Sequence, residues 1–110
     1  MKKYKVSINE TSNKLIVKFE TNFFLTNHQN YEYNNIDEAS NSPLAQQLFY
    51  LPFVKKIYIS SNFIAIERYS IIEWKDVQEE VAEQIEKYLN EGNIVVTETK
   101  GVKKSAVTIY

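Results

Sequence analysis

Five carboxylates recur at helical spacing in the second half of the chain and are the residues best placed to do chemistry. They are Asp76, Glu79, Glu80, Glu83 and Glu86. Residues three or four apart share one side of a helix, so this side could dock a basic protein surface or touch iron weakly through hard oxygen ligands. The solvated side of an ordinary amphipathic helix has the same pattern. Like charges at this spacing destabilise a helix by about a few tenths of a kcal/mol per pair. A functional reason would explain why a helix carries several such pairs, so we take the five carboxylates as a candidate partner-docking face.

The side chains on which most other chemistry depends are absent or single. The sequence has no Cys, which excludes disulfides, thiolate metal ligands and iron–sulfur clusters held by thiolates. Its one His, His28, lies in the polar stretch 26–30 and is expected on a surface loop. The two glycines, Gly92 and Gly101, do not form a phosphate-binding loop. We therefore predict no enzyme activity, no cofactor, and no catalytic, cofactor-binding or metal-binding residue.

The charge balance narrows the range of partners. Thirteen basic and 14 acidic residues give a net charge of −1, so no overall field attracts nucleic acid or an acidic membrane. The eight Tyr and six Phe residues could stack on bases, but their high strand propensity favours packing in the core and on the sheet. No stretch approaches the roughly 18 apolar residues that a membrane span requires. We expect a cytoplasmic protein whose partner is another protein, with no nucleic acid and no membrane bound.

Alternating apolar residues predict two antiparallel hairpins as the framework for these side chains. The hairpins join residues 4–8 to 15–19 and residues 54–60 to 63–68. In the second hairpin, Ser61 and Asn62 are expected to form a two-residue turn. Further short strands are predicted at 23–25, 31–33 and 94–97, with 102–109 as a last strand or a tail.

Two helices complete the predicted framework. Ser42 is a good N-cap and Pro43 suits the first helical position, and this helix is expected to end before Pro52. Residues 37–39 are expected to form one helical turn ahead of it. A longer helix is predicted over residues 74–90. Its apolar stripe comprises Trp74, Val77, Val81, Ile85, Tyr88 and Leu89, and Gly92 is expected as the C-cap.

The order of these elements predicts the fold class. A chain of 110 residues fits one domain, and helices with a single apolar stripe need a sheet face to cover. We therefore predict an α+β fold: a two-layer sandwich whose largely antiparallel sheet is covered by one short and one long helix.

The middle of the chain also resembles a known family. The run Ser42-Pro43-Leu44-Ala45, followed by Leu48-Phe49, Leu51 and Val54, is similar to the core of the N-terminal domain of Nfu/NifU-type iron–sulfur scaffold proteins. The likeness continues through Ile57-Tyr58-Ile59 and Asn62-Phe63-Ile64-Ala65-Ile66 to Trp74, and a weaker likeness covers residues 10–19. The opening lacks both prolines of the family pattern, Phe53 stands where Gly is usual, and Asn62 stands for Asp.

The resemblance implies a family-like domain over residues 1–96 and a C-terminal extension over 97–110. In the full-length family this domain precedes one whose Cys-x-x-Cys binds the cluster, and the present sequence has no Cys. The resemblance therefore implies a standalone, non-catalytic accessory module of iron–sulfur cluster assembly, with iron binding only as a family-level property. Its partner would be a Cys-x-x-Cys scaffold or an iron–sulfur client protein. The alternative is a protein-binding or regulatory module that kept the fold but works outside iron–sulfur metabolism, using residues 97–110.

Overall fold

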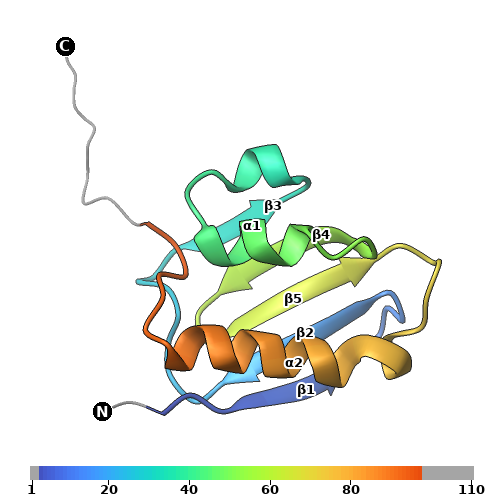
Figure 1. Cartoon of the computed structure of the whole chain (residues 1–110), viewed down its shortest axis with the longest axis horizontal. Helices are drawn as coiled ribbons and strands as arrows, with labels where there is room; N and C mark the ends of the chain where they lie inside the picture. The colour runs from blue at the N-terminus through green and yellow to red at the C-terminus, as the bar shows by residue number, and fades with distance from the viewer. Residues whose placement is uncertain (1–2, 98–110) are drawn as a thin grey trace.

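Both helices cover the same face of a five-stranded antiparallel sheet in the computed structural model, which describes residues 3–97 (Figure 1). The strands lie in the order β1-β2-β5-β4-β3. They are β1 (Val6–Glu10), β2 (Ile16–Thr21), β3 (Asn30–Tyr33), β4 (Val54–Ser60) and β5 (Phe63–Arg68). The helices are α1 (Pro43–Phe49) and α2 (Trp74–Asn90), preceded by a 3₁₀ helix, η1 (Ile36–Ala39). The predicted α+β sandwich and both hairpins are confirmed.

Alternate residues of the central strands make the covered face of the sheet. On β5, Ile64 and Ile66 are fully buried, and they pair with the buried Ile59 and Ile57 of β4. Successive side chains of a strand point to opposite faces, so the period-two pattern in the sequence becomes one apolar layer. The two-residue turn between β4 and β5 is also confirmed. Its first residue, Ser61, has a φ of 50°, which matches the twist of a tight hairpin.

Helix α1 is short, neutral and almost wholly part of the core. The hydroxyl of Ser42 accepts a hydrogen bond from the N–H of Ala45 at 3.0 Å, and Pro43 is the first helical residue, as predicted. Leu44, Ala45 and Leu48 are fully buried. The helix ends at Phe49, before Pro52. Its short length is offset by this cap and by burial against the sheet, because an isolated helix of this length would be marginal.

Helix α2 packs its apolar stripe on the sheet, and its first residue, Trp74, is held in place by ring contacts and a hydrogen bond. Trp74 lies between Phe19 and Phe53, with ring centroids 5.7 Å and 5.9 Å away and both pairs edge-on. Its ring N–H donates to the carbonyl of Leu15 at 2.8 Å. The buried face comprises Trp74, Val81, Ala82, Ile85 and Leu89. The C-cap is Glu91, and Gly92, the next residue, has a φ of 79°, so the left-handed end predicted at Gly92 is found one position past the cap. Phe53 fills one side of the Trp74 site.

The strand predicted at residues 23–25 is wrong. After β2 the chain must reach β3 at the far edge of the sheet, and it crosses the end of the β4–β5 hairpin to do so. The N–H of Leu25 donates to the carbonyl of Ser61 in that hairpin's turn, at 2.6 Å. A segment that crosses the ends of strands cannot pair along them. The strand predicted at 31–33 is confirmed as β3.

The strand predicted at residues 94–97 is also wrong. This segment is irregular and runs past the start of α1, where the Ser42 hydroxyl donates to the carbonyl of Val95 at 2.6 Å. The N–H of Thr97 donates to the carbonyl of Asn41 at 2.7 Å. Side-chain packing on the core, rather than pairing with a strand, therefore accounts for Val95 and Val96, while Ile94 is exposed.

The last predicted element, residues 102–109, lies outside the described residues. The division of the chain into residues 1–96 and a 97–110 extension therefore stays a prediction.

Candidate functional site

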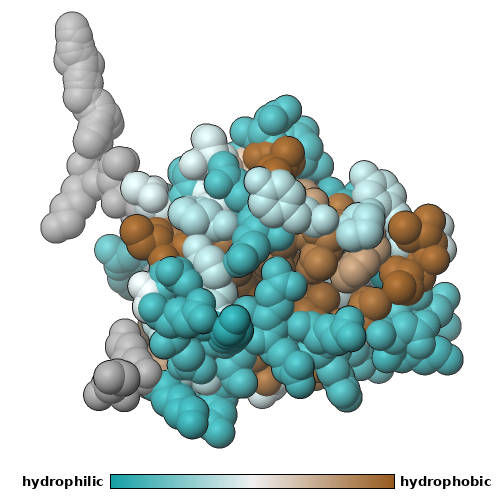
Figure 2. Space-filling view, viewed as in Figure 1, coloured by the Kyte–Doolittle hydropathy of each residue, from teal (hydrophilic) through white to brown (hydrophobic). Residues whose placement is uncertain are grey.

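The acidic face of α2, formed by Asp76, Glu79, Glu80, Glu83 and Glu86, lies on the side of the helix away from its buried stripe. The first four side chains are exposed and Glu86 is half-buried. Figure 2 shows hydrophilic side chains along the front of α2, while apolar side chains gather between the two helices. The structure thus brings the five predicted residues together on one surface.

The carboxylates of this face have no counter-ion in the described part of the chain. Among residues 3–97, no Lys, Arg or His lies within 4.0 Å of the carboxylates of Asp76, Glu79, Glu80 or Glu83. Near the end of the helix, Lys87 pairs instead with Glu91 at 3.7 Å. Within residues 3–97, the acidic face therefore presents negative charge that no cation pairs.

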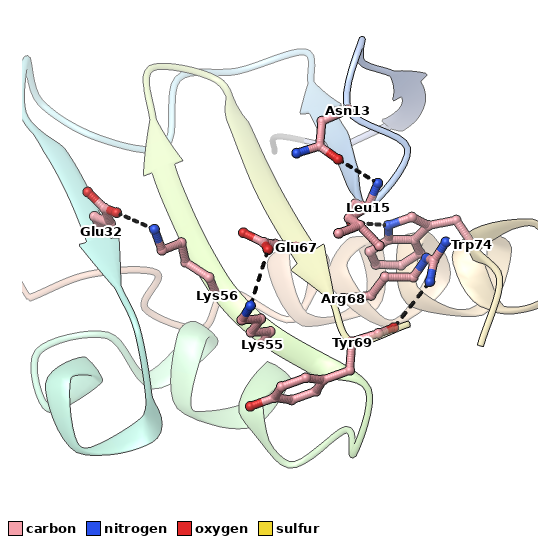
Figure 3. A network of polar contacts seen from close by, with 9 residues as sticks. All are labelled: Asn13, Leu15, Glu32, Lys55, Lys56, Glu67, Arg68, Tyr69 and Trp74. Carbon is pink, nitrogen blue, oxygen red and sulfur yellow. Dashed lines mark hydrogen bonds and ion pairs between the residues drawn. The ribbon is translucent and has the colours of Figure 1, made fainter. Parts of the chain in front are cut away.

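Charged residues on the sheet are arranged differently. The Lys56 ammonium lies 2.9 Å from the Glu32 carboxylate of the adjacent strand, and Lys55 lies 3.7 Å from Glu67 (Figure 3). The hydrogen bond to Glu32, followed by its charge, raises the pKa of Lys56 above its ordinary value. Cross-strand neighbours of opposite charge are favourable. The sheet thus pairs these charges internally, whereas the exposed carboxylates of the acidic face have no partner cation among residues 3–97.

Glu86 has a second role, which its spacing in the sequence does not reveal. Its carboxylate accepts a hydrogen bond from the N–H of Val6 on β1 at 3.0 Å. One turn further along, the Asn90 amide accepts from the N–H of Tyr4 at 2.7 Å and donates to the Tyr4 carbonyl at 3.1 Å. These contacts hold the second half of α2 against the edge strand of the sheet. Glu86 therefore belongs to the boundary of the acidic face rather than to its free centre.

A groove separates α2 from β1 beyond this attachment. Its volume is about 200 Å³, and its lining combines apolar side chains with carboxylates. The lining residues are Val6, Ile8, Glu79, Ala82, Glu83 and Glu86. The acidic face therefore borders a recess next to the edge of the sheet.

A larger hollow of about 240 Å³ lies at the other end of α2. It separates the β1–β2 loop from the first turn of the helix, beside Trp74. Its rim carries Glu10 and Glu73 together with Lys14 and Lys75. Because the two signs are balanced there, this hollow favours no charged ligand.

Metal binding finds no support in the described residues. Among residues 3–97, no three His, Cys, Asp or Glu side chains are arranged to hold a metal ion. Separately, none of the described helices combines the length and apolar character that a membrane crossing requires.

The remaining residues weighed from the sequence fall in structural positions. His28 is exposed with a φ of 69°, so the predicted surface-loop position is confirmed. Tyr33 is buried in the core and its hydroxyl donates to Asn41 at 2.7 Å. Tyr4 packs edge-on against Phe23, with ring centroids 5.3 Å apart. Tyr4 and Tyr33 therefore serve packing rather than a surface on which bases could stack.

Sequence reasoning missed a buried cation, Arg68. It continues the inward-facing alternation of β5 and is only 5% exposed. Its guanidinium donates to the carbonyl of Tyr69 at 3.1 Å (Figure 3). The guanidinium also lies 3.4 Å from the Glu73 carboxylate, while its Nε has no partner among the described residues. The sequence does contain an indication of this burial. Position 68 is two residues after Ile66, so it faces the same side of the strand as the buried Ile64 and Ile66, although an Arg at the end of a strand is usually exposed.

Comparison with solved structures finds the same fold in other proteins. A NifU-like protein from Saccharomyces cerevisiae is 25% identical with a TM-score of 0.72, over 84% of this chain and 85% of that one. A protein from Staphylococcus aureus is 22% identical with a TM-score of 0.63, over 74% of this chain and 98% of that one. A protein from Staphylococcus epidermidis is 21% identical with a TM-score of 0.51, over 74% and 93%. The two staphylococcal proteins show the fold alone. Comparison with curated proteins finds no match.

The family follows from a model that covers most of the described fold. The model for the N-terminal part of the scaffold protein Nfu/NifU matches residues 6–92, from the first residue of β1 to the glycine that follows the C-cap of α2. The fold and this match define a domain related to iron–sulfur cluster assembly. The chain belongs to the Nfu/NifU scaffold family through this N-terminal domain.

Proposed function

We propose that this domain is a non-catalytic accessory module of iron–sulfur cluster assembly that binds a protein partner rather than the cluster. The partner is a scaffold that carries the Cys-x-x-Cys or an iron–sulfur client protein, and it docks on the acidic face of α2. The observation that supports this assignment most directly is the set of carboxylates on that face without a counter-ion among residues 3–97, in a chain that pairs Lys55 and Lys56 of its sheet internally.

The chemistry of the chain supports a role without a bound cluster. Protein iron–sulfur clusters are held chiefly by Cys thiolates, and the sequence has none. We therefore expect the purified protein to remain colourless after anaerobic incubation with iron and sulfide. A stable, stoichiometric brown product would contradict this part of the proposal.

Electrostatics supports a docking role for α2. Charge complementarity steers association and selects the partner, and an exposed face of one sign is suited to a basic surface. Carboxylates in helix i,i+4 positions repel one another, so these pairs do not stabilise α2. A binding role gives a reason for their retention that folding does not.

The test is affinity capture from native cytosolic extract with three tagged proteins. They are the wild type, the variant Glu79→Lys/Glu83→Lys, and the control Glu20→Lys/Asp37→Lys. The two variants change the net charge equally, but Glu20 lies on β2 and Asp37 on η1. We expect wild type and control to recover a Cys-x-x-Cys scaffold, a cysteine desulfurase or iron–sulfur apoproteins, and the α2 variant to lose them.

Two other results would count against the proposal. Equal recovery by the α2 variant would move the docking site away from the acidic face. Recovery of unrelated proteins alone would favour the alternative, a binding or regulatory module that works outside iron–sulfur metabolism.

A further inference from the structure

The outer edge of β1 offers backbone groups that the sheet does not use. In the antiparallel pairing of β1 with β2, hydrogen-bonded residues alternate with residues whose N–H and C=O point away. The N–H of Val6 points away from β2, because it donates to Glu86 on α2. Two residues on, Ile8 has the same orientation, and its N–H and C=O have no partner among the described residues.

Helix α2 closes the first part of this edge and leaves the second part open. The side chains of Asn90 and Glu86 bond the backbone of Tyr4 and of Val6, in the positions that a neighbouring strand would occupy. β1 and α2 lie side by side and run in opposite directions (Figure 1). At Ile8 the two elements are separated by the groove instead of being joined by hydrogen bonds. Edge strands are commonly protected in this way, and an edge protected only in part has room for a short strand.

The spacing of the groove's carboxylates matches that of alternate residues in a strand. Glu79 and Glu83 are separated by four helical residues, which is about 6 Å along the axis. Residues two apart in an extended chain are about 6.8 Å apart. A strand laid beside Ile8 would therefore bring alternate side chains to these two carboxylates, which have no counter-ion within residues 3–97.

We propose that the partner's docking element is a short extended segment with Lys or Arg at alternate positions, which adds to the sheet as a sixth strand beside Ile8. Its backbone pairs with the free N–H and C=O of Ile8, and its basic side chains contact Glu79 and Glu83. Strand addition obtains affinity from main-chain hydrogen bonds and specificity from alternate side chains. This inference rests on the proposed function only for the identity of the partner, because it concerns the way in which a partner segment binds beside the acidic face.

The test uses the isotope-labelled full chain and the synthetic peptide Ac-Lys-Val-Lys-Val-Lys-NH2 in an NMR titration. A second peptide has the same side chains and charge but is N-methylated at all five residues, so none of its residue N–H groups can donate a hydrogen bond to the sheet. We expect the first peptide to shift the amide signals of residues 7–10 and 79–83 and to slow hydrogen exchange at the Ile8 amide. The N-methylated peptide is expected to bind more weakly and to leave that exchange unchanged.

The charge-reversed proteins complete the test. The charge reversal in Glu79→Lys/Glu83→Lys is expected to weaken the affinity for the first peptide by about tenfold or more, because it turns two attractions between charges into repulsions. The control Glu20→Lys/Asp37→Lys should bind like the wild type. Equal binding of both peptides would reduce the interaction to charge attraction, and unshifted residues 7–10 at millimolar peptide would overturn the proposal.

The outcomes separate this inference from the proposed function. Capture of iron–sulfur proteins without pairing at Ile8 would leave the accessory role standing and remove strand addition. Pairing at Ile8 without capture of such proteins would support the strand-binding site and overturn the proposed role in iron–sulfur cluster assembly.

Discussion

The two helices lie on the same face of the sheet but differ in length, charge and burial. Helix α1 has seven residues, none charged, with a buried N-cap and three fully buried side chains. Helix α2 has 17 residues, and its N-cap, Glu73, makes no side-chain hydrogen bond to the helix. Its outer face carries carboxylates without counter-ions among the described residues. The comparison teaches that α1 serves packing, whereas the surface that we propose for a partner lies on α2.

The largest expected effect is on α1, where truncation of a core residue should damage the fold. Leu48→Ala removes a fully buried side chain and leaves a cavity, so we expect a loss of about 2–5 kcal/mol in the free energy of unfolding. Urea denaturation followed by circular dichroism measures it. A loss below about 0.5 kcal/mol, the range of surface changes, would contradict the description of α1 as core.

The cap of α1 comes next. Ser42→Ala removes the acceptor for the Ala45 N–H and the donor for the Val95 carbonyl. We expect a loss of about 1–3 kcal/mol, since a cap and a buried hydrogen bond disappear together. Ser12→Ala, at an exposed loop position, is the matched control and should leave stability unchanged. If Ser42→Ala abolished partner binding while stability held, the functional contrast between the helices would fail.

The pH dependence of stability tests the structural role of the core near α1. Burial raises the pKa of Tyr33 above its ordinary value, so the unfolded chain loses this proton first as pH rises. The unfolded state then binds fewer protons than the folded state, and the stability present below about pH 10 falls above it. Tyr33→Phe should cost about 1 kcal/mol at neutral pH through the lost hydrogen bond to Asn41 and should flatten this alkaline decline. An unchanged slope from about pH 9 to pH 11 would contradict the assignment to Tyr33.

The smallest effect on stability is expected on α2. Glu79→Lys/Glu83→Lys changes exposed side chains without ion pairs in the described structure, so the free energy of unfolding should change by no more than about 0.5 kcal/mol. The same urea series measures it, with Glu20→Lys/Asp37→Lys beside it. A loss comparable with that of Ser42→Ala would mean that these carboxylates serve the fold.

Local patterns in the sequence were enough to predict most of the fold. The alternation in β4 and β5, the Ser42-Pro43 start of α1 and the stripe of α2 each depend on neighbouring residues, and each is confirmed. The segments at 23–25 and 94–97 have strand-like composition, but their paths are set by distant contacts. One crosses the hairpin turn and the other packs beside the cap of α1, and nothing local encodes either path.

The candidate site was predictable only in part. Helical spacing places the five carboxylates on one face without any knowledge of the sheet. That Glu86 bonds Val6, and that Ile8 borders a groove beside Glu79 and Glu83, depends on β1 being the edge strand next to α2. Strand order is a property of the whole chain, so the spacing of the carboxylates could not reveal these contacts.

The central claim is that the outer face of α2 serves binding and not folding, and one paired measurement tests it most directly. A purified Cys-x-x-Cys scaffold domain is titrated calorimetrically into the wild type, Glu79→Lys/Glu83→Lys and Glu20→Lys/Asp37→Lys, with the unfolding free energy of each protein measured in parallel. We predict that affinity falls by about tenfold or more in the α2 variant alone while stability stays within about 0.5 kcal/mol in all three. Equal affinity in the three proteins, or a loss of affinity that follows a loss of stability, would contradict the claim.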